Sequence, residues 1–250
     1  MTTRNQELRR FAHDANRALE IGALASPVLR DLGARVRYID HCTTEELRKK
    51  YAGVSKNICE NLVDVDYVWV SGPIDQVLTD WSDVDLIAAS HVIEHVPDIV
   101  GWLRELGKIM SETGRISLAI PEKTRIFDLA RAPSTLGDVL EAFYAKRKEP
   151  SLRQVIDHRR YGGRINGLNF WQHEAKPEEL EPLISDVNQL STFIERYHTG
   201  EYIDTHCWVF TIESFRSIIE DLNRLKYLDY KIEGVPQVFG HEFIVHLKRH

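Results

Sequence analysis

From Arg17 to Pro121, short apolar runs alternate with amphipathic stretches. This alternation predicts strand–helix–strand units and a parallel sheet covered by helices. The strands are expected at Ala18–Gly22, Val36–Asp40, Tyr67–Val70, Val84–Ala89 and Arg115–Ile120. The intervening helices are expected at Pro27–Leu32, Thr44–Ala52, Ile74–Trp81 and Ile99–Ser111. The pattern therefore indicates an α/β fold.

The regular alternation stops after Pro121 and resumes near the end of the chain. Residues 122–209 are rich in charge, aromatic side chains and helix formers, which is typical of a helical insertion. A helix over Thr211–Leu225 follows, and then two strands near Tyr227–Glu233 and Gln237–Lys248. We therefore expect residues 1–250 to form a single domain, with residues 122–209 as a helical substrate-binding insertion or cap.

Composition restricts the class of protein and its predicted location but does not indicate an activity. A chain of 250 residues can bury one sizeable core, and 43% hydrophobic with 28% charged residues is ordinary for a globular protein. No apolar run approaches the roughly 20 residues that a membrane span needs. The N-terminal residues are polar and lack the apolar core of a signal peptide. These features predict a cytoplasmic protein without a membrane span.

Cysteine usage and net charge argue against two further classes. Cys42, Cys59 and Cys207 lie far apart and form no C-x-x-C pair, so reduced thiols are expected rather than a disulfide framework. The net charge of −6 gives no general attraction to phosphates. Nucleic acid is therefore not the expected partner, although Arg147–Arg164 forms a local basic stretch.

Two residues at strand ends point to a nucleoside-bearing cofactor. Gly22 follows the first strand, where the lack of a Cβ lets a ligand approach the backbone. Asp40 closes the second strand, where a carboxylate can accept hydrogen bonds from ribose hydroxyls. Glu20 would repel a pyrophosphate but attract an amine. The missing second and third glycines also disfavour a dinucleotide and favour a ligand with an amino-acid tail.

Four segments resemble, in order, the successive motifs of class I S-adenosylmethionine-dependent methyltransferases. They are Leu19–Gly22, Asp40, Asp85–Val96 with its Ile-Glu-His-Val element, and Gly114–Pro121. The resemblance covers roughly the first half of the chain. It implies a Rossmann-like fold with a seven-stranded, mostly parallel sheet, an antiparallel last strand, and S-adenosylmethionine as cofactor.

A narrower resemblance extends beyond these motifs. Phe127–Asp128, Arg131–Thr135 and Val209–Phe215 are similar to methyltransferase domains of bacterial surface-polysaccharide and glycosyltransferase systems. This likeness implies a role in polysaccharide biosynthesis and a carbohydrate acceptor.

The family resemblance also implies a set of cofactor-binding positions. Glu20 and Gly22 would line the methionine part, Asp40 would hold the ribose, and Ile74 would pack on the adenine. The full set is Glu20, Gly22, Ala23, Asp40, Gly72, Ile74, Ser90 and His91. Two positions depart from the family pattern: Ala23–Ala25 replaces the usual Gly-x-Gly, and Ser71 stands where an acidic residue is common. These departures leave open a binding module that has lost catalysis.

Three histidines are candidates for the general base of transfer to a hydroxyl. His91 closes the fourth strand, where ligands of such sheets bind, and a polar orienting role is the alternative. His95 lies four residues later and could share that face, although a helix-start histidine often bonds to backbone. His158 belongs to the insertion. His91 and His95 are not assured of metal-binding geometry at a strand–helix turn, so no metal is expected.

The insertion supplies the expected acceptor site. Asp128, Arg131, His158 and His206 are polar residues suited to a hydroxyl-rich ligand, unless they pair with one another. The predicted function is methyl transfer from S-adenosylmethionine to a hydroxyl of a carbohydrate or sugar-containing small molecule. The alternatives are an inactive methyltransferase-like module in polysaccharide assembly, or methylation of another small molecule or a protein side chain. The oligomeric state stays open.

Overall fold

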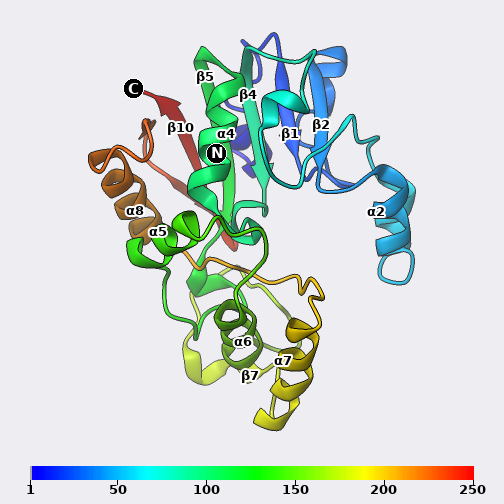
Figure 1. Cartoon of the computed structure of the whole chain (residues 1–250), viewed down its shortest axis with the longest axis vertical. Helices are drawn as coiled ribbons and strands as arrows, with labels where there is room; N and C mark the ends of the chain where they lie inside the picture. The colour runs from blue at the N-terminus through cyan, green and yellow to red at the C-terminus, as the bar shows by residue number, and fades with distance from the viewer. Residues whose placement is uncertain (1) are drawn as a thin grey trace.

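The protein, described over residues 2–250 by a computed structural model, is built around one mixed sheet (Figure 1). Its strands pair in the order β3-β2-β1-β4-β5-β10-β8, and β9 pairs with β10 outside that path. The neighbours from β3 to β5 are parallel, whereas β10 is antiparallel to β5. The strands are β1 (Ala18–Ile21), β2 (Val36–Asp40), β3 (Tyr67–Val68), β4 (Val84–Ser90), β5 (Met110–Pro121), β8 (Tyr230–Ile232), β9 (Gln237–Phe239) and β10 (Glu242–Arg249). The predicted Rossmann-like fold class, with its antiparallel last strand, is confirmed.

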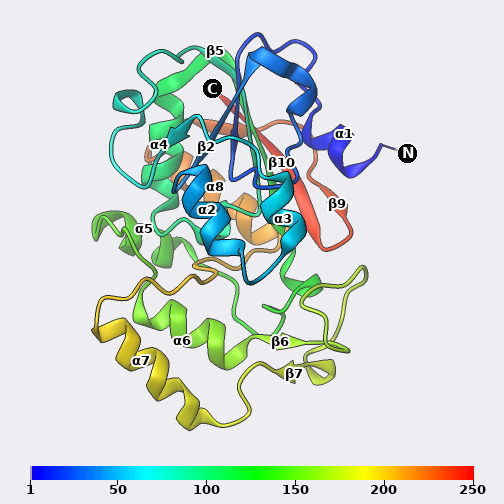
Figure 2. The same cartoon turned by 90° about the vertical axis from the view of Figure 1, so that its right-hand side faces the viewer.

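Alternate residues of each strand enter two separate apolar cores. In β4, Ile87 and Ala89 join one core while Leu86 and Ala88 join the other, as the two-residue period of a strand requires. The sheet lies between α4 on one side and α1 on the other (Figure 2). The helices around it are α1 (Arg4–Leu8), α2 (Thr44–Tyr51), α3 (Lys56–Asn61), α4 (Ile99–Ile109), α5 (Leu136–Tyr144) and α8 (Ile212–Arg224).

The insertion begins where β5 ends and extends the molecule beyond that edge of the sheet (Figures 1 and 2). Its outer part holds α6 (Leu152–Tyr161), α7 (Leu190–His198) and a two-stranded ribbon of β6 (Gly163–Arg164) and β7 (Glu181–Pro182). Helices α6 and α7 pack on each other, while α5 packs against α4 and α8. The insertion is thus positioned at the carboxyl edge of the parallel strands.

Three predicted elements are wrong in detail. A 3₁₀ helix over Arg30–Arg35 replaces the helix expected at Pro27–Leu32, and a single 3₁₀ turn at Ile74–Gln76 replaces Ile74–Trp81. The strand expected at Gln237–Lys248 is a hairpin of β9 and β10. Gly240, with φ +61°, occupies the turn that splits it.

Two further observations concern the cysteines and the helices. Cys42, Cys59 and Cys207 are all free thiols, and Cys207 is buried. Among residues 2–250, none of the helices combines the length and the apolar character that crossing a membrane requires.

Candidate functional site

A cavity of about 400 Å³ lies at the carboxyl ends of β1, β2 and β4. The strand order reverses between β1 and β4, and open α/β sheets bind their ligands at this place. The lining combines strand ends, α2 and parts of the insertion: Ile21, Gly22, Leu24, Ile39, Asp40, His41, Lys50, Tyr51, Trp69, Val70, His91, Val92, His95, Val96, Pro97, Trp102, Lys148, Tyr202 and Asp204. The sheet and the insertion therefore share one candidate site.

Gly22 forms the tight turn at the floor of this cavity. Its φ is +68°, and its N–H donates to the Ile39 carbonyl across 3.0 Å. A Cβ at this position would lie 2.8 Å from Cγ2 of Val92. Both the left-handed backbone and the close approach therefore require glycine.

Asp40 presents a buried carboxylate at the end of β2. Its Oδ1 accepts a hydrogen bond from the His41 backbone N–H at 2.7 Å, and His41 Nδ1 lies 2.6 Å away. These contacts fix the orientation of the carboxylate at the cavity wall. Gly22 and Asp40, two of the residues predicted to hold the cofactor, thus meet in one cavity.

Apolar and aromatic groups form the wall beyond Asp40. Trp69 is buried, and its indole N–H donates to the Gly72 carbonyl at 3.1 Å, which fixes the ring. Trp102 and Ile39 complete this wall. Ile74 has no exposed surface and lies in the core, so Trp69 rather than Ile74 borders the cavity.

Several predicted cofactor residues do not line this cavity: Glu20, Ala23, Gly72, Ile74 and Ser90. The strand period explains Glu20, because it alternates with Leu19 and Ile21, which enter the core on the opposite face. Its carboxylate accepts the backbone N–H groups of Val28 and Leu29 at 2.7 and 2.9 Å. Glu20 thus anchors the segment that follows the turn. The pKa of Glu20 is raised because burial outweighs those hydrogen bonds.

His91 lies at the cavity wall between two carboxylates. Its Nε2 is 2.7 Å from Glu242, and its Nδ1 is 3.5 Å from Glu94. Burial alone would lower the pKa of His91, but the hydrogen bond to Glu242 and the negative charge of the nearby Glu94 raise it to about 9. Burial would raise the pKa of Glu242, but its bonds to His91 and Arg4 hold it at about 2. His91 is therefore a cation near neutral pH and has no free lone pair with which to accept a proton.

His95 faces the cavity together with Asp204. Its Nδ1 is 2.9 Å from the Asp204 carboxylate, so the ring donates there and keeps Nε2 as its acceptor nitrogen. Burial would lower the pKa of His95, but the Asp204 hydrogen bond raises it. Its ring also meets that of His206 edge-on, with centroids 4.7 Å apart.

The four residues predicted to bind the acceptor form a buried cluster. Asp128 contacts Arg131 at 2.7 Å and His206 at 2.6 Å, and none of its surface is exposed. Burial would raise the pKa of Asp128, but the charges of His206 and Arg131 hold it well below its usual range. Burial lowers the pKa of His158 to about 3, so this histidine is neutral. Asp128 and Arg131 thus pair with each other, and none of the four lines the cavity at the strand ends.

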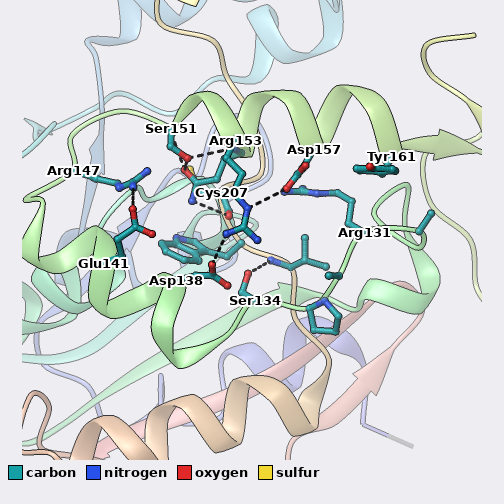
Figure 3. A pocket seen from close by; sticks show the side chains of 16 residues that line it. Arg131, Ser134, Asp138, Glu141, Arg147, Ser151, Arg153, Asp157, Tyr161 and Cys207 are labelled. Atoms are coloured by element: carbon teal, nitrogen blue, oxygen red, sulfur yellow. Dashed lines mark hydrogen bonds and ion pairs between the residues drawn. The ribbon is translucent and has the colours of Figure 1, made fainter. Parts of the chain in front are cut away.

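A second cavity, of about 420 Å³, lies between α5 and α6. Figure 3 shows that its charged side chains face one another. Arg147 pairs with Glu141 at 2.7 Å, and Arg153 pairs with Asp138 at 2.9 Å and with Asp157 at 3.5 Å. These mutual ion pairs already satisfy the charges, so the first cavity is the better candidate for chemistry.

Sequence reasoning identified only four of the 19 lining residues, namely Gly22, Asp40, His91 and His95. Trp69 stands one residue beyond β3, inside a predicted strand, and its position before Gly72 was the available signal. Lys148, Tyr202 and Asp204 come from the insertion, and no local pattern predicts that they reach the sheet edge. Their placement depends on the tertiary fold.

Comparison with known proteins gives a likeness of fold. No protein-family model matches the chain, and no curated protein sequence matches it significantly. The mitomycin 7-O-methyltransferase MmcR aligns with 98% of this chain and 54% of its own, at 13% identity and a TM-score of 0.42. PigF, solved with SAH, aligns with 97% of this chain and 53% of its own, at 12% identity and a TM-score of 0.41. The CcbJ methyltransferase from Streptomyces caelestis aligns over 98% and 95%, at 9% identity and a TM-score of 0.47. The chain thus spans about half the length of MmcR and PigF.

Proposed function

We propose that this chain is an S-adenosylmethionine-dependent methyltransferase acting on a hydroxyl of a carbohydrate or sugar-containing small molecule. The observation that carries the proposal is the meeting of the Gly22 turn and the Asp40 carboxylate in one cavity at the carboxyl edge of the sheet. In such folds the glycine turn admits the cofactor close to the backbone, and the carboxylate accepts hydrogen bonds from ribose. Trp69 and Ile39 supply an apolar wall for the adenine ring.

The proposed reaction is an in-line displacement at the methyl carbon of the sulfonium. The acceptor oxygen forms a bond to that carbon while the carbon–sulfur bond breaks. The electron pair of the broken bond stays on sulfur, which gives S-adenosylhomocysteine. The acceptor oxygen gives up its proton in the process. Holding the two reactants in line supplies much of the acceleration, and a general base adds about 10²- to 10⁴-fold.

The surroundings of the three candidate histidines favour different roles. His91, with a pKa raised to about 9, suits orientation of a polar group rather than proton abstraction. His158, with a pKa of about 3, is a weak base and lies outside the cavity. His95 faces the cavity and has Asp204 behind it, so it is the best placed of the three to receive or redirect the acceptor proton.

A sugar acceptor suits the side of the cavity that α2 and the insertion supply. Tyr51 and Tyr202 offer rings on which a sugar face can stack, and Lys148 and Asp204 offer hydrogen-bonding groups. A place in surface-polysaccharide biosynthesis, in the cytoplasm, is part of the same proposal and rests on the sequence resemblance.

Calorimetric titration with S-adenosylmethionine and S-adenosylhomocysteine tests the proposal. Wild-type protein should bind both in the micromolar range, and Asp40→Ala should abolish binding without loss of fold. Glu141→Ala, a surface change at the second cavity, is the matched control and should leave binding unchanged. A folded wild-type protein that binds neither compound would contradict the proposal. If both bind, mass analysis of products across sugar, small-molecule and peptide acceptors identifies the substrate class.

One observation favours a binding module without catalysis as the second candidate. Leu24 is the middle residue of Ala23–Ala25, which replaces the usual Gly-x-Gly; it adopts φ +46° and lines the cavity. A branched side chain there reduces the room for the methionine part of the cofactor. Absence of cofactor binding, with binding of a sugar ligand retained, would support this candidate.

A further inference from the structure

Glu94 is a buried carboxylate that lacks a hydrogen-bonding partner. Its residue is 1% exposed, and within residues 2–250 neither Oε1 nor Oε2 accepts a hydrogen bond. The nearest cationic group is His91 Nδ1, 3.5 Å from Oε1. The long contact with the His91 cation supplies charge but no hydrogen bond, so both oxygens of Glu94 remain available to a further cation.

Two histidines beside Glu94 are arranged as metal ligands. One ligand atom each from Glu94, His95 and His206 lies within 4.8 Å of the other two. His95 Nδ1 is 2.9 Å from Asp204, and His206 Nδ1 is 2.6 Å from Asp128. A carboxylate behind each ring fixes the Nδ1–H tautomer and leaves Nε2 as the free ligand atom, as in carboxylate–histidine–metal triads.

We propose that Glu94, His95 and His206 form a binding site for a first-row divalent transition-metal ion such as Zn²⁺. Hydrogen bonds already hold the two contributing segments together without the ion. The Cys207 N–H donates to the Glu94 carbonyl at 2.6 Å, and the Trp208 indole N–H donates to the Val96 carbonyl at 2.6 Å. The site is therefore built from rigidly joined segments of the sheet edge and the insertion.

The donor set selects the kind of metal. Two imidazoles and one carboxylate suit Zn²⁺ and other borderline ions, whereas Mg²⁺ and Ca²⁺ prefer all-oxygen sites. Zinc bonds of 2.0–2.1 Å imply ligand atoms about 3.3 Å apart. The three ligand atoms lie within 4.8 Å of one another, so binding requires the side chains to close in, while the carboxylates of Asp128 and Asp204 balance the added charge.

Three protein ligands leave a coordination position open, as in catalytic zinc sites. His95 is the most exposed of the three ligands and lines the cavity, so the open position faces the proposed cofactor site. A hydroxyl bound to the ion there would lose its proton to solvent more readily, and His95, whose Nε2 would then hold the ion, would no longer accept that proton. This role rests on the proposed methyl transfer, but metal binding itself does not.

Two other groups have metal-ligand spacing and weaker claims. His91, His241 and Glu242 lie close together, but Glu242 already pairs with His91 and with Arg4 at 2.5 Å. Asp40, His41 and Cys42 form a group whose histidine is largely exposed. The group of Asp40, His41 and Cys42 can bind zinc through its thiol, so the experiment must distinguish it from the Glu94 site.

The test is calorimetric titration of chelator-treated protein with Zn²⁺, in wild-type protein, Glu94→Gln and His206→Gln, with Co²⁺ absorption as a second probe. His41→Gln is the matched control. Circular dichroism and thermal unfolding of the metal-free variants verify their fold. S-adenosylhomocysteine titration is run in parallel.

Wild type and His41→Gln should bind about one Zn²⁺ per chain, and Co²⁺ should give visible bands without thiolate charge transfer. Glu94→Gln and His206→Gln should lose tight binding, and Asp204→Asn should weaken it about 10- to 100-fold. Retained S-adenosylhomocysteine binding in Glu94→Gln separates this site from the cofactor site. Absence of tight binding in wild type, unchanged affinity in folded Glu94→Gln or His206→Gln, or loss of binding in His41→Gln would overturn the assignment.

Discussion

Gly22→Ala is expected to destabilise the protein through two effects that can be measured apart. The φ of +68° costs a non-glycine residue about 1–2 kcal/mol. The added Cβ would also lie 2.8 Å from Cγ2 of Val92, whose branched side chain has little freedom to move. Overpacking of this kind costs about 1–3 kcal/mol. For a chain of this size, the sum lowers the Tm by roughly 5–15 °C.

Two other glycines provide matched controls. Gly200, the left-handed residue that ends α7, has φ +77° with nothing within 4 Å of an added Cβ, so Gly200→Ala bears the backbone cost alone. Gly53 lacks both features, so Gly53→Ala should be nearly neutral or slightly stabilising. The overlap with Val92 is then the difference in destabilisation between Gly22→Ala and Gly200→Ala.

Thermal and urea unfolding, followed by circular dichroism, give these free-energy differences. Val92→Ala in the Gly22→Ala background should recover the overlap cost and leave the backbone cost, which a double-mutant cycle detects as coupling. Equal destabilisation by Gly22→Ala and Gly200→Ala, with no coupling to Val92, would refute the close-approach argument.

Three further outcomes are expected. Glu20→Gln should lower the free energy of unfolding by about 1–2 kcal/mol in urea titrations, because an amide accepts less strongly from Val28 and Leu29; an unchanged midpoint would contradict this. Glu242, with its pKa held at about 2 against an ordinary 4.5, stabilises the fold above pH 5, and this contribution fades as pH falls toward 2. Wild type should therefore exceed Glu242→Gln in stability at pH 7, with the gap shrinking near pH 3; a constant gap would argue against the ion pairs. Arg153→Met should change stability by less than about 1 kcal/mol and leave S-adenosylhomocysteine affinity unchanged, because its ion pairs are largely exposed; weaker cofactor binding would implicate the second cavity.

The sheet was predictable from the sequence because its signal is local. Val36–Asp40 was predicted with the observed bounds, since Val36, Tyr38 and Ile39 are β-branched or aromatic residues that favour a strand. Helices were less certain. The helix expected over residues 27–32 is only a 3₁₀ segment at Arg30–Arg35, because Gly33, with φ +56° and ψ −126°, interrupts the helical backbone there.

The site was predictable only at the strand ends. Gly22 and Asp40 follow from the position of each strand terminus, which the sequence reveals. The contact of Asp128 with His206 joins residues far apart in the chain, and so does that of His95 with Asp204. Such pairings are set by how the insertion packs, and the contacts of Asp128 with Arg131 and His206 correspond to the mutual pairing that the sequence left open as the alternative.

Arg4 gives the first helix a practical importance for anyone producing this protein. Its guanidinium bonds to Glu242, which holds His91, and to the hydroxyl of Ser90 at the end of β4. An affinity tag or fusion partner placed directly before α1 would lie next to these contacts. It is expected to disturb them and, through His91, the ligand cavity. Tagging beyond Arg249, at the far end of β10 from Glu242, leaves those contacts undisturbed and is the safer choice for binding assays.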